Sequence, residues 1–354
     1  MSSVKILHIA DTHFGRKFTG LSYDKAKIRN SEILLSFSNV LERFDADVVL
    51  LAGDIFDCES NVEIINFVTH VFEKFPNKRF FIACGNHDPL ESNTYKKLSC
   101  IIPDNVKIFS DNMETVFLPE YNTCIHGISF SGNYSYASLI DGKDISKENI
   151  INIMVMHGDF SKNSSYNPIT EKLLSGTNMD YIALGHVHGF SGIKSAGSVQ
   201  YAYPGVFEPG GFDETGECGV IYGAISKEGN SLDFYPSSTR KYHILNIDIS
   251  HFKSQEEIAE CIRGMINIDD LYRIILSGNR NGFMPDIKLL ENILAGFYVE
   301  IIDKSLFADN ILCYEDELSL KGKTAAALTQ LKDKYDSEVF EGACNILTNL
   351  MCGK

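Results

Sequence analysis

The sequence lacks the long apolar runs of membrane proteins. No stretch approaches the roughly 18 consecutive apolar residues that identify a membrane-spanning helix. The opening residues, MSSVKILHIADTHFG, show no charged-then-apolar leader with a small-residue cleavage site. Internal repeats and low-complexity segments are also absent. We therefore expect a cytoplasmic protein that does not associate with a membrane.

The sequence also lacks any C-x-x-C pair. Its cysteines are odd in number and scattered along the chain, at positions 58, 84, 100, 124, 218, 261, 313, 344 and 352. Neither a structural zinc site nor a disulfide framework fits this spacing. We expect reduced and mostly buried thiols.

Basic residues are fewer than acidic ones. The chain has 32 Lys and Arg against 47 Asp and Glu, a formal net charge of −15. Lys and Arg supply most non-specific binding to nucleic acid, so this balance argues against such binding. A nucleic-acid substrate is still compatible with it, because a local cleft, bound cations or a basic partner can reverse the potential where the phosphate lies.

The length and the apolar pattern indicate a globular protein with more than one part. The chain has 354 residues, 44% of them hydrophobic, which is enough for a sizeable core and a second domain. Up to residue 240, apolar strands alternate with amphipathic helices, as at 23–44 and 61–75. Residues 241–308 read as strand, helix, strand, helix, strand, and 309–354 as helical. The pattern predicts an α/β protein with boundaries after residues 240 and 308.

Polar clusters follow five of the predicted strands. They are Asp11 and His13 in ADTHFG, Asp54 and Asp57 in GDIFD, Asn86, His87 and Asp88 in GNHD, His157 and Asp159 in HGD, and His186 and His188 in GHVH. Open α/β sheets bind ligands at the carboxyl ends of their strands, so we expect these clusters at one edge. Imidazole, carboxylate and amide oxygen are ligands for Mn, Fe and Zn. The joint pattern predicts two metal sites that share one bridging ligand.

Glycines accompany four of these clusters, at positions 53, 85, 158 and 185. Because glycine adopts backbone conformations that other residues avoid, we expect these four to let the chain turn sharply beside the ions.

The ordered motifs DTH, GDIFD, GNHD, HGD and GHVH resemble those of the calcineurin-like metallophosphoesterases over about residues 5–210. Within that family the chain is similar to the SbcD-like DNA repair exonucleases, nuclease subunits that work with an SbcC-like coiled-coil ATPase. The opening ILHIADTHFG, the FDETGECG turn at 212–219 and a small α/β unit followed by helices carry this narrower resemblance. It implies a two-sheet sandwich flanked by helices (1–240), a small α/β cap domain (241–308) and a C-terminal helical segment (309–354).

The resemblance also implies a ligand set and an oligomeric state. One metal would be held by Asp11, His13, Asp54 and His188, and the other by Asp54, Asn86, His157 and His186, with Asp54 as the bridge. We expect two Mn²⁺ ions, with Fe, Zn and Mg as alternatives, and no other cofactor. Relatives commonly dimerise through helices near the metal site, which predicts a homodimer paired through 62–75 or through the helix after Asp88.

His87 is the predicted catalytic residue. It is adjacent to Asn86, so in an extended chain it points away from the metal that Asn86 faces and can reach the scissile phosphate. A near-neutral pKa suits a proton donor to the leaving oxygen. Either Asp57 or Asp88 could orient the ring, and a purely structural histidine is the alternative interpretation.

Three functions fit these residues. The leading prediction is a metal-dependent phosphodiesterase, a DNA exonuclease or endonuclease subunit of SbcD type that acts in DNA repair by two-metal hydrolysis. The second is a phosphodiesterase or phosphatase for small nucleotides or phosphoproteins, for which an acidic chain is no obstacle. The third is a regulatory subunit that needs a partner ATPase for activity. A cap domain favours a large substrate over a small one.

Overall fold

The computed structural model describes residues 3–18, 20–57, 61–141, 144–280, 284–307 and 311–352. The chain divides into two compact units, Met1–Arg240 and Lys241–Lys354. The second predicted boundary, between 308 and 309, lies outside the described residues. No helix in the described ranges combines the length and the apolar character that crossing a membrane requires.

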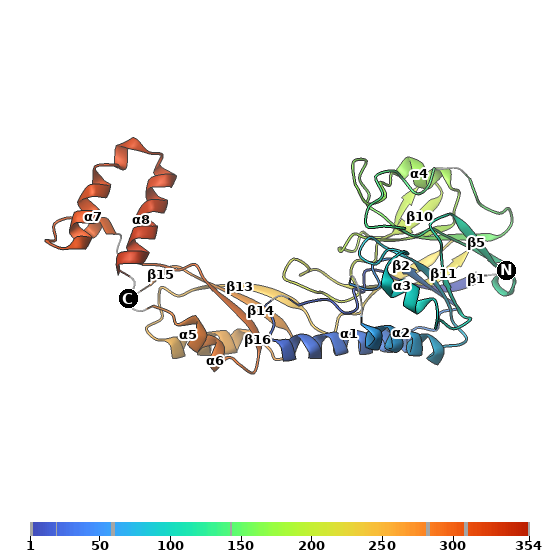
Figure 1. The fold of residues 1–354 in the computed structure, drawn as a ribbon, viewed down its shortest axis with the longest axis horizontal. Helices are drawn as coiled ribbons and strands as arrows, with labels where there is room; N and C mark the ends of the chain where they lie inside the picture. Colours follow the sequence, from blue (N-terminus) through green and yellow to red (C-terminus); the bar gives the residue numbers. More distant parts are fainter. Residues whose placement is uncertain are drawn as a thin grey trace. The chain divides into compact units, whose positions relative to one another are not determined.

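The first unit contains two six-stranded sheets (Figure 1). In spatial order, the first sheet consists of β12 (Ser231–Pro236), β11 (Gly219–Ser226), β1 (Ser3–Ile9), β2 (Val48–Ala52), β3 (Arg79–Ala83) and β4 (Val106–Ile108). The second consists of β5 (Glu114–Leu118), β6 (Thr123–Gly127), β7 (Ile151–His157), β8 (Tyr181–Gly185), β10 (Val199–Ala202) and β9 (Lys194–Ala196). β1 to β4 run parallel, as do β6, β7, β8 and β10. The predicted two-sheet α/β sandwich is confirmed.

Alternating side chains divide the strands between two cores. On β1, Ile6 packs into the core between the sheets, together with Ile153 of β7. Its neighbours Leu7 and Ile9 point to the other face and pack with Phe37 of a covering helix. A strand that is buried on both faces has side chains of period 2 in two different cores, which explains its nearly continuous apolar run.

The helices of the first unit begin at capping residues. They are α1 (Tyr23–Arg43), α2 (Val62–Lys74), α3 (Asn93–Leu98), α4 (Glu171–Gly176) and the 3₁₀ turn Pro119–Tyr121. Ser22 accepts a hydrogen bond from the backbone of Lys25, and Asn61 accepts one from Ile64. α1 and α2 cover the face of the first sheet that is turned away from the second (Figure 1).

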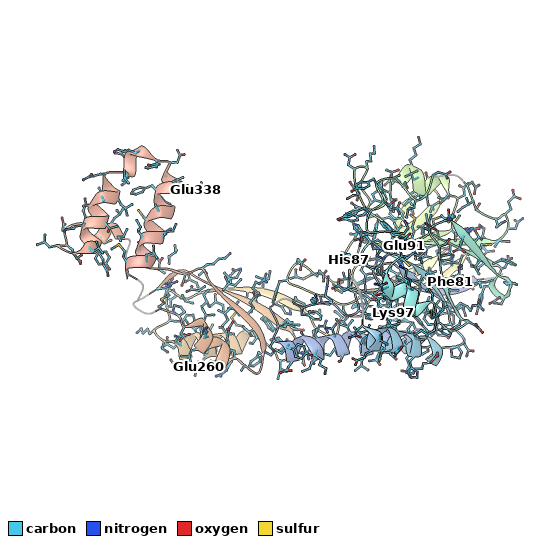
Figure 2. The ribbon with its side chains drawn as sticks, viewed as in Figure 1. Phe81, His87, Glu91, Lys97, Glu260 and Glu338 are labelled. Carbon is cyan, nitrogen blue, oxygen red and sulfur yellow. The ribbon has the colours of Figure 1, made fainter. Side chains whose placement is uncertain are left out.

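The second unit is a small α/β layer followed by helices. Its elements are β13 (Tyr242–Asp248), α5 (Gln255–Met265), β14 (Leu271–Ser277), β15 (Asn279–Arg280), α6 (Ile287–Ile293), β16 (Tyr298–Asp303), β17 (Leu306–Phe307), the 3₁₀ turns Ile311–Tyr314 and Lys332–Lys334, α7 (Leu320–Thr329) and α8 (Ser337–Cys352). The parallel order β13-β14-β16 and the packing of α5 and α6 against it follow the predicted alternation. Figure 2 labels Glu260 on α5 and Glu338 on α8.

Two expectations need correction or completion. The strands that precede the five polar clusters do not share one sheet edge, because β1, β2 and β3 belong to the first sheet and β7 and β8 to the second. The seven cysteines with described side chains are free, and four of them, Cys84, Cys124, Cys218 and Cys344, are buried.

Candidate metal centre

Backbone hydrogen bonds fasten the loop after β1 to the loop after β2. The amide of Asp11 donates to the carbonyl of Gly53 at 3.1 Å, and the amide of His13 donates to that of Asp54 at 2.9 Å. Because β1 and β2 are parallel neighbours, both loops leave the same end of the sheet. The side chains of Asp11, His13 and Asp54 are therefore held in one place by the main chain.

Four of the predicted ligands have a left-handed backbone. The φ angles are 51° at Asp11, 45° at His13, 49° at Asp54 and 111° at His186. Residues other than glycine rarely adopt positive φ, and such strain gathers at functional sites where the surrounding structure holds it in place. The fold thus maintains an unfavourable conformation at the ends of three different strands.

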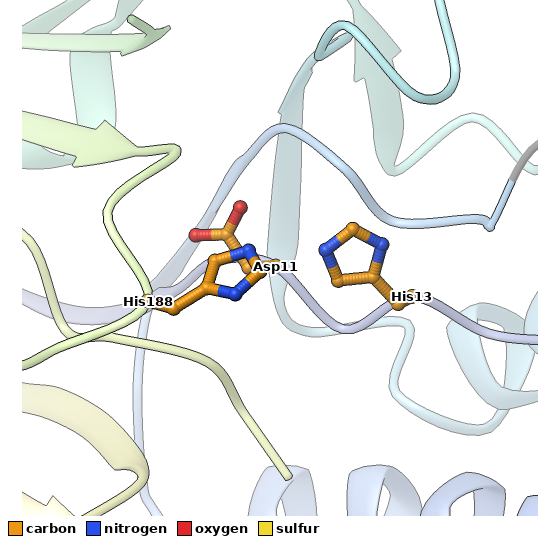
Figure 3. A group of neighbouring side chains, drawn as sticks. All are labelled: Asp11, His13 and His188. Atoms are coloured by element: carbon orange, nitrogen blue, oxygen red, sulfur yellow. The ribbon is translucent and has the colours of Figure 1, made fainter. Parts of the chain in front are cut away.

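The first group of ligand atoms comes from two loops. Asp11 and His13 follow β1, and His188 follows β8; their ligand atoms lie within 4.8 Å of one another (Figure 3). Among the described residues, neither ring nitrogen of buried His13 has a hydrogen-bond partner. The nearest carboxylate oxygen, on Asp57, is 3.6 Å from Nδ1, too far for a hydrogen bond. Buried polar atoms rarely stay unsatisfied, and a cation would satisfy this imidazole.

In the second group, lone pairs converge. His157 Nε2 lies 3.0 Å from Asn86 Oδ1 and 3.4 Å from Asp54 Oδ2. His186 Nδ1 lies 3.1 Å from Asn86 Oδ1 and 3.3 Å from His157 Nε2. His157 Nδ1 donates to the carbonyl of Ala52, which leaves Nε2 as the lone-pair nitrogen of the neutral ring. Acceptors this close repel one another unless a proton or a metal ion lies between them.

The pKa values of the two histidines in the second group also indicate that positive charge is stabilised there. Burial lowers the pKa of His157, but the Asp54 carboxylate outweighs burial and raises it to about 9. Burial and the charge on His157 lower the pKa of His186 to about 4. One cationic charge is therefore stable in this buried cluster, and a divalent ion would supply it in place of the proton.

The two groups adjoin. Asp11, Asp54 and His157 form a further set whose ligand atoms lie within 4.8 Å. Asp11 also accepts from the backbone amide of His186, at 3.1 Å. The seven predicted ligands are thus brought into two neighbouring clusters.

The glycines beside the clusters act mostly through close approach. Of the four, Gly53 alone has a positive φ, +85°. A Cβ on Gly85 would lie 2.1 Å from Asp54 Oδ1, and one on Gly185 would lie 1.8 Å from the carbonyl oxygen of Ala52. Positions 85, 158 and 185 do not need the left-handed conformation that glycine allows, and there glycine leaves room for neighbouring atoms.

Residues 4–190, more than half of the chain, match the family model described as calcineurin-like phosphoesterase. The chain belongs to the calcineurin-like phosphoesterases. This family binds a pair of metal ions, and the His and Asp clusters of the chain are candidates to hold them.

The phosphoesterase is also similar in sequence to two curated proteins. It is 26% identical over 282 residues to the uncharacterized metallophosphoesterase YhaO of Bacillus subtilis (strain 168), an alignment that covers 74% of this chain and 67% of the relative. It is 22% identical over 321 residues to the DNA double-strand break repair protein Mre11 of Sulfurisphaera tokodaii, covering 82% of this chain and 79% of the relative.

In this calcineurin-like phosphoesterase, His87 lies on the loop between β3 and α3 (Figure 2). Its side chain is 45% exposed, and its Nδ1 is 3.5 Å from Asp57 Oδ1. Its ring meets the ring of His13 edge-on, with 5.0 Å between centroids. The contact with Asp57 raises the pKa of His87, which keeps a proton on the ring nearer neutral pH.

Asp88 has a different position. Its buried carboxylate accepts hydrogen bonds from the backbone amides of Ile55, Phe56 and Gly85 and from the hydroxyl of Tyr95. Burial and the neighbouring Asp54 raise its pKa to about 7. Asp88 therefore fastens the loops together, and Asp57 is the carboxylate beside His87.

Glu214 in the FDETGECG turn lies beside the candidate metal centre of the phosphoesterase and was not among the predicted site residues. Its Oε1 lies 2.6 Å from His188 Nδ1, and its two oxygens accept from Arg16 at 3.0 and 3.2 Å. The backbone amide of Gly210 donates to it as well. If Nδ1 of His188 donates to Glu214, Nε2 is left as the metal-binding nitrogen. The glycine-rich turn marked the segment, but its acidic residues did not indicate a contact with His188 across 26 residues of chain.

Proposed function

We propose that this phosphoesterase is a metal-dependent DNA nuclease subunit of SbcD type that acts in DNA repair. The similarity to the Mre11 repair protein covers 82% of the chain and so extends beyond the 240 residues of the first unit. A relationship that includes the second unit supports the cap-domain assignment of 241–308 and a macromolecular substrate.

We assign one cation to Asp11, His13, Asp54 and His188, and the other to Asp54, Asn86, His157 and His186. The unpartnered nitrogens of His13 and the converging lone pairs around His157 support this assignment. When bound, the cations supply Lewis acidity that lowers the pKa of water and neutralises phosphoryl oxygens. Mn²⁺ is the proposed metal, and the same donor set accepts Fe, Zn or Mg.

The position of His87 is the observation that best supports a hydrolytic function. Its ring is half-exposed beside the first cluster, contacts Asp57 and has a raised pKa. Such a ring can reach a substrate and donate a proton to the leaving oxygen, a step that contributes about 10²- to 10⁴-fold in rate. Its backbone amide donates to Asp54 Oδ1, beside the proposed bridge. The ligand atoms of His87, His13 and Asp57 also lie within 4.8 Å of one another, and we propose that the His87 ring serves as the proton donor and not as a metal ligand.

The test is hydrolysis of bis(p-nitrophenyl) phosphate and of linear single- and double-stranded DNA, with Mn²⁺, with Mg²⁺ and with EDTA. We expect Mn²⁺-dependent cleavage of both kinds of substrate and a loss of about 10²-fold or more in His87→Ala, with metal content retained. His251→Ala, at an exposed histidine of the second unit, is the control. Loss of metal together with activity in His87→Ala would contradict the division between ligands and proton donor.

A small-substrate phosphodiesterase or phosphatase is the second candidate, favoured by the net charge of −15. An acidic chain repels the many phosphates of a DNA backbone more strongly than the one or two charges of a small ester. Cleavage of bis(p-nitrophenyl) phosphate with both DNA forms untouched, in the presence and absence of a partner ATPase, would favour this candidate.

We also propose that α8 binds an SbcC-like coiled-coil ATPase, which would make activity depend on a partner. Val339, Ile346 and Leu350 are 59%, 61% and 72% exposed. Their spacing of seven and four residues puts them on one stripe of the helix. The opposite face of α8, with Phe340 and Cys344, packs in the core of the C-terminal helices. An apolar stripe beside a satisfied core suits a second helix from another chain.

A homodimer paired through α2 or α3 remains our proposal for the oligomeric state. Val62 at the start of α2 is 55% exposed, and Ile101 after α3 is 43% exposed. Sedimentation equilibrium measures the oligomeric state, and a monomer at all concentrations would contradict the proposed homodimer.

A further inference from the structure

Three tyrosine rings form a row that begins at the metal centre and reaches solvent. The ring of Tyr166 lies 5.1 Å from that of His186, and the ring of Tyr134 lies 5.6 Å from that of Tyr166. Tyr136 follows at 6.1 Å from Tyr134. The angle between ring planes is 30° for the Tyr166–Tyr134 pair and 16° for the Tyr134–Tyr136 pair. We call Tyr166, Tyr134 and Tyr136 the tyrosine row.

The outer rings of the row are strongly exposed. Tyr134 is 60% and Tyr136 is 76% accessible to solvent. Large aromatic side chains usually contribute to a core, where their apolar area is removed from water. Exposed and nearly parallel rings beside a candidate active site are instead suited to hold another flat ring.

The backbone holds this row rigidly against the metal loops. The amide of Ser135 donates to the carbonyl of Ser165, and the amide of Asn167 donates to the carbonyl of Ser135, both at 2.8 Å. The side chain of Asn133 donates to the carbonyl of Asn86 at 2.7 Å, and that of Asn167 donates to the carbonyl of His157. Two candidate ligands are thus tied to the row, and little ordering remains to be done when a ligand binds.

We propose that the tyrosine row is a stacking platform for an unpaired nucleobase of the DNA strand whose phosphate lies at the metal centre. This inference rests on the proposed function. Because Tyr166 touches His186, a base on the row belongs to a nucleotide at or next to the cleaved phosphate. The substrate class is therefore single-stranded DNA or a frayed duplex end.

Stacking also suits the charge of the chain. Proteins that bind single strands without sequence preference combine basic grooves with aromatic side chains on which bases stack. A chain of net charge −15 gains little from the first of these contributions. Stacking is independent of net charge and depends on the π-face that every base has, so it can supply affinity where electrostatics do not.

The absence of tryptophan from the chain provides a direct test. Tyr134→Trp introduces a single tryptophan, which is excited at wavelengths where the tyrosines of the chain do not absorb. The variant is titrated with oligo-dT in EDTA so that no cleavage occurs. An oligonucleotide of the same length with abasic sites keeps the phosphates and removes the bases. We expect saturable quenching by oligo-dT, and binding of the abasic strand that is weaker by roughly fivefold or more. Equal affinity for the two strands, or binding without a change in emission, would overturn the proposal.

A second measurement uses the affinity of labelled oligo-dT by fluorescence anisotropy. The double variant Tyr134→Ala with Tyr136→Ala is expected to bind oligo-dT roughly fivefold or more weakly than the wild type. The double variant Tyr134→Phe with Tyr136→Phe should bind as the wild type does, because the ring and not the hydroxyl stacks on the base. Tyr23→Ala, at a tyrosine that is 82% exposed on α1, should bind as the wild type does. Wild-type affinity in the double alanine variant would assign the row to contact with a protein instead.

These outcomes are separable from those of the proposed function. Mn²⁺-dependent hydrolysis of bis(p-nitrophenyl) phosphate by the wild type tests the metal chemistry alone. Hydrolysis without base-dependent binding would leave a phosphoesterase whose tyrosine row has no base to stack. Base-dependent binding without hydrolysis would support the stacking platform and contradict the proposed nuclease activity.

Discussion

At the scale of single residues, Glu214 illustrates how a proposed metal ligand, His188, is held by a neighbouring carboxylate. Its carboxylate contacts His188 Nδ1 at 2.6 Å and is itself held by Arg16 and by the amide of Gly210. The side chain is 4% exposed, so solvent does not compete for these contacts. Partners of this kind fix the orientation and the basicity of a ligating imidazole.

Glu214→Gln should therefore weaken Mn²⁺ binding by about 10- to 100-fold, because a neutral amide no longer raises the basicity of His188. Isothermal titration calorimetry of the metal-free protein with Mn²⁺ measures this without reference to activity. Asp213→Asn, at the exposed carboxylate next in sequence, is the matched control. Equal Mn²⁺ affinity in Glu214→Gln and wild type would reduce Glu214 to a structural partner of Arg16.

His8 is a buried residue with a consequence for stability rather than for chemistry. Its Nδ1 lies 2.9 Å from the hydroxyl of Tyr181, and its Nε2 lies 3.1 Å from the carbonyl of Leu184, in the core between the sheets. Burial lowers its pKa from 6.5 to about 3. Below pH 6.5 the imidazole of the unfolded chain takes up a proton that the buried imidazole does not, so stability falls as pH falls.

The expected loss from His8 between pH 8 and pH 5 is about 2 kcal/mol in the free energy of unfolding. Urea unfolding in EDTA at the two pH values measures it. His8→Gln cannot titrate and should show a smaller difference between the two pH values by about that amount, even if the substitution itself lowers stability at both. An identical pH dependence in wild type and variant would contradict this account.

At the scale of elements, α1 departs from the simple amphipathic helix that its sequence period predicts. Arg29 is fully buried, although the pattern places charged side chains on the solvent face. Its guanidinium donates to Glu208 Oε2 at 2.6 Å and to the hydroxyl of Thr239 at 2.9 Å. Glu208 follows β10 and Thr239 follows β12, so the burial of Arg29 depends on segments about 200 residues away, which a local period cannot detect.

Glu208→Gln removes one charge of this buried pair and leaves Arg29 with only the more distant Glu32 carboxylate, at 3.4 Å, as an ion-pair partner. The expected cost is about 3 to 5 kcal/mol in the free energy of unfolding, measured by urea denaturation. Asp45→Asn breaks the solvent-exposed pair with Lys5 and should cost far less, because water screens an exposed ion pair. Equal costs for the two variants would mean that the buried pair is no more important than the exposed one.

Elements with a strong period could be predicted, and short ones could not. The strand-helix order of 241–303 follows the apolar pattern closely. β4, β9 and β10 have three or four residues, too few for an alternation to be visible. β5 and β6 pair in an antiparallel register that sequence alone does not specify. β5, β6, β9 and β10 complete the second sheet around β7 and β8.

At the scale of the whole molecule, the sequence indicated which residues to consider for the candidate metal site but not how the fold brings them together. The recurrence of histidines and carboxylates after apolar strands singled out five clusters, and the family resemblance then implied which seven of their residues are ligands. The two clusters in fact form where the strand ends of one sheet meet those of another, as the contact between Asp54 of the first and His157 of the second shows. Glu214 and the tyrosine row lie on loops, whose positions depend on the completed sandwich and not on a local period.

The exposed apolar stripe of α8 bears on whether the chain acts alone or with a partner. Ile346 and Leu350 on the exposed stripe of α8 should be buried by the proposed ATPase partner, and each buried apolar side chain contributes about 1.5 to 3 kcal/mol. Ile346→Glu with Leu350→Glu should therefore weaken the complex by about 100-fold or more, measured by titration calorimetry with an SbcC-like ATPase from the same genome. Asn345→Glu adds one negative charge at an exposed polar position of α8 and should bind normally. Because the stripe lies in the second unit, bis(p-nitrophenyl) phosphate hydrolysis by the first should persist in the double variant. Loss of the complex with retained hydrolysis would separate recruitment from catalysis, and undiminished binding would place the ATPase contact elsewhere on the chain.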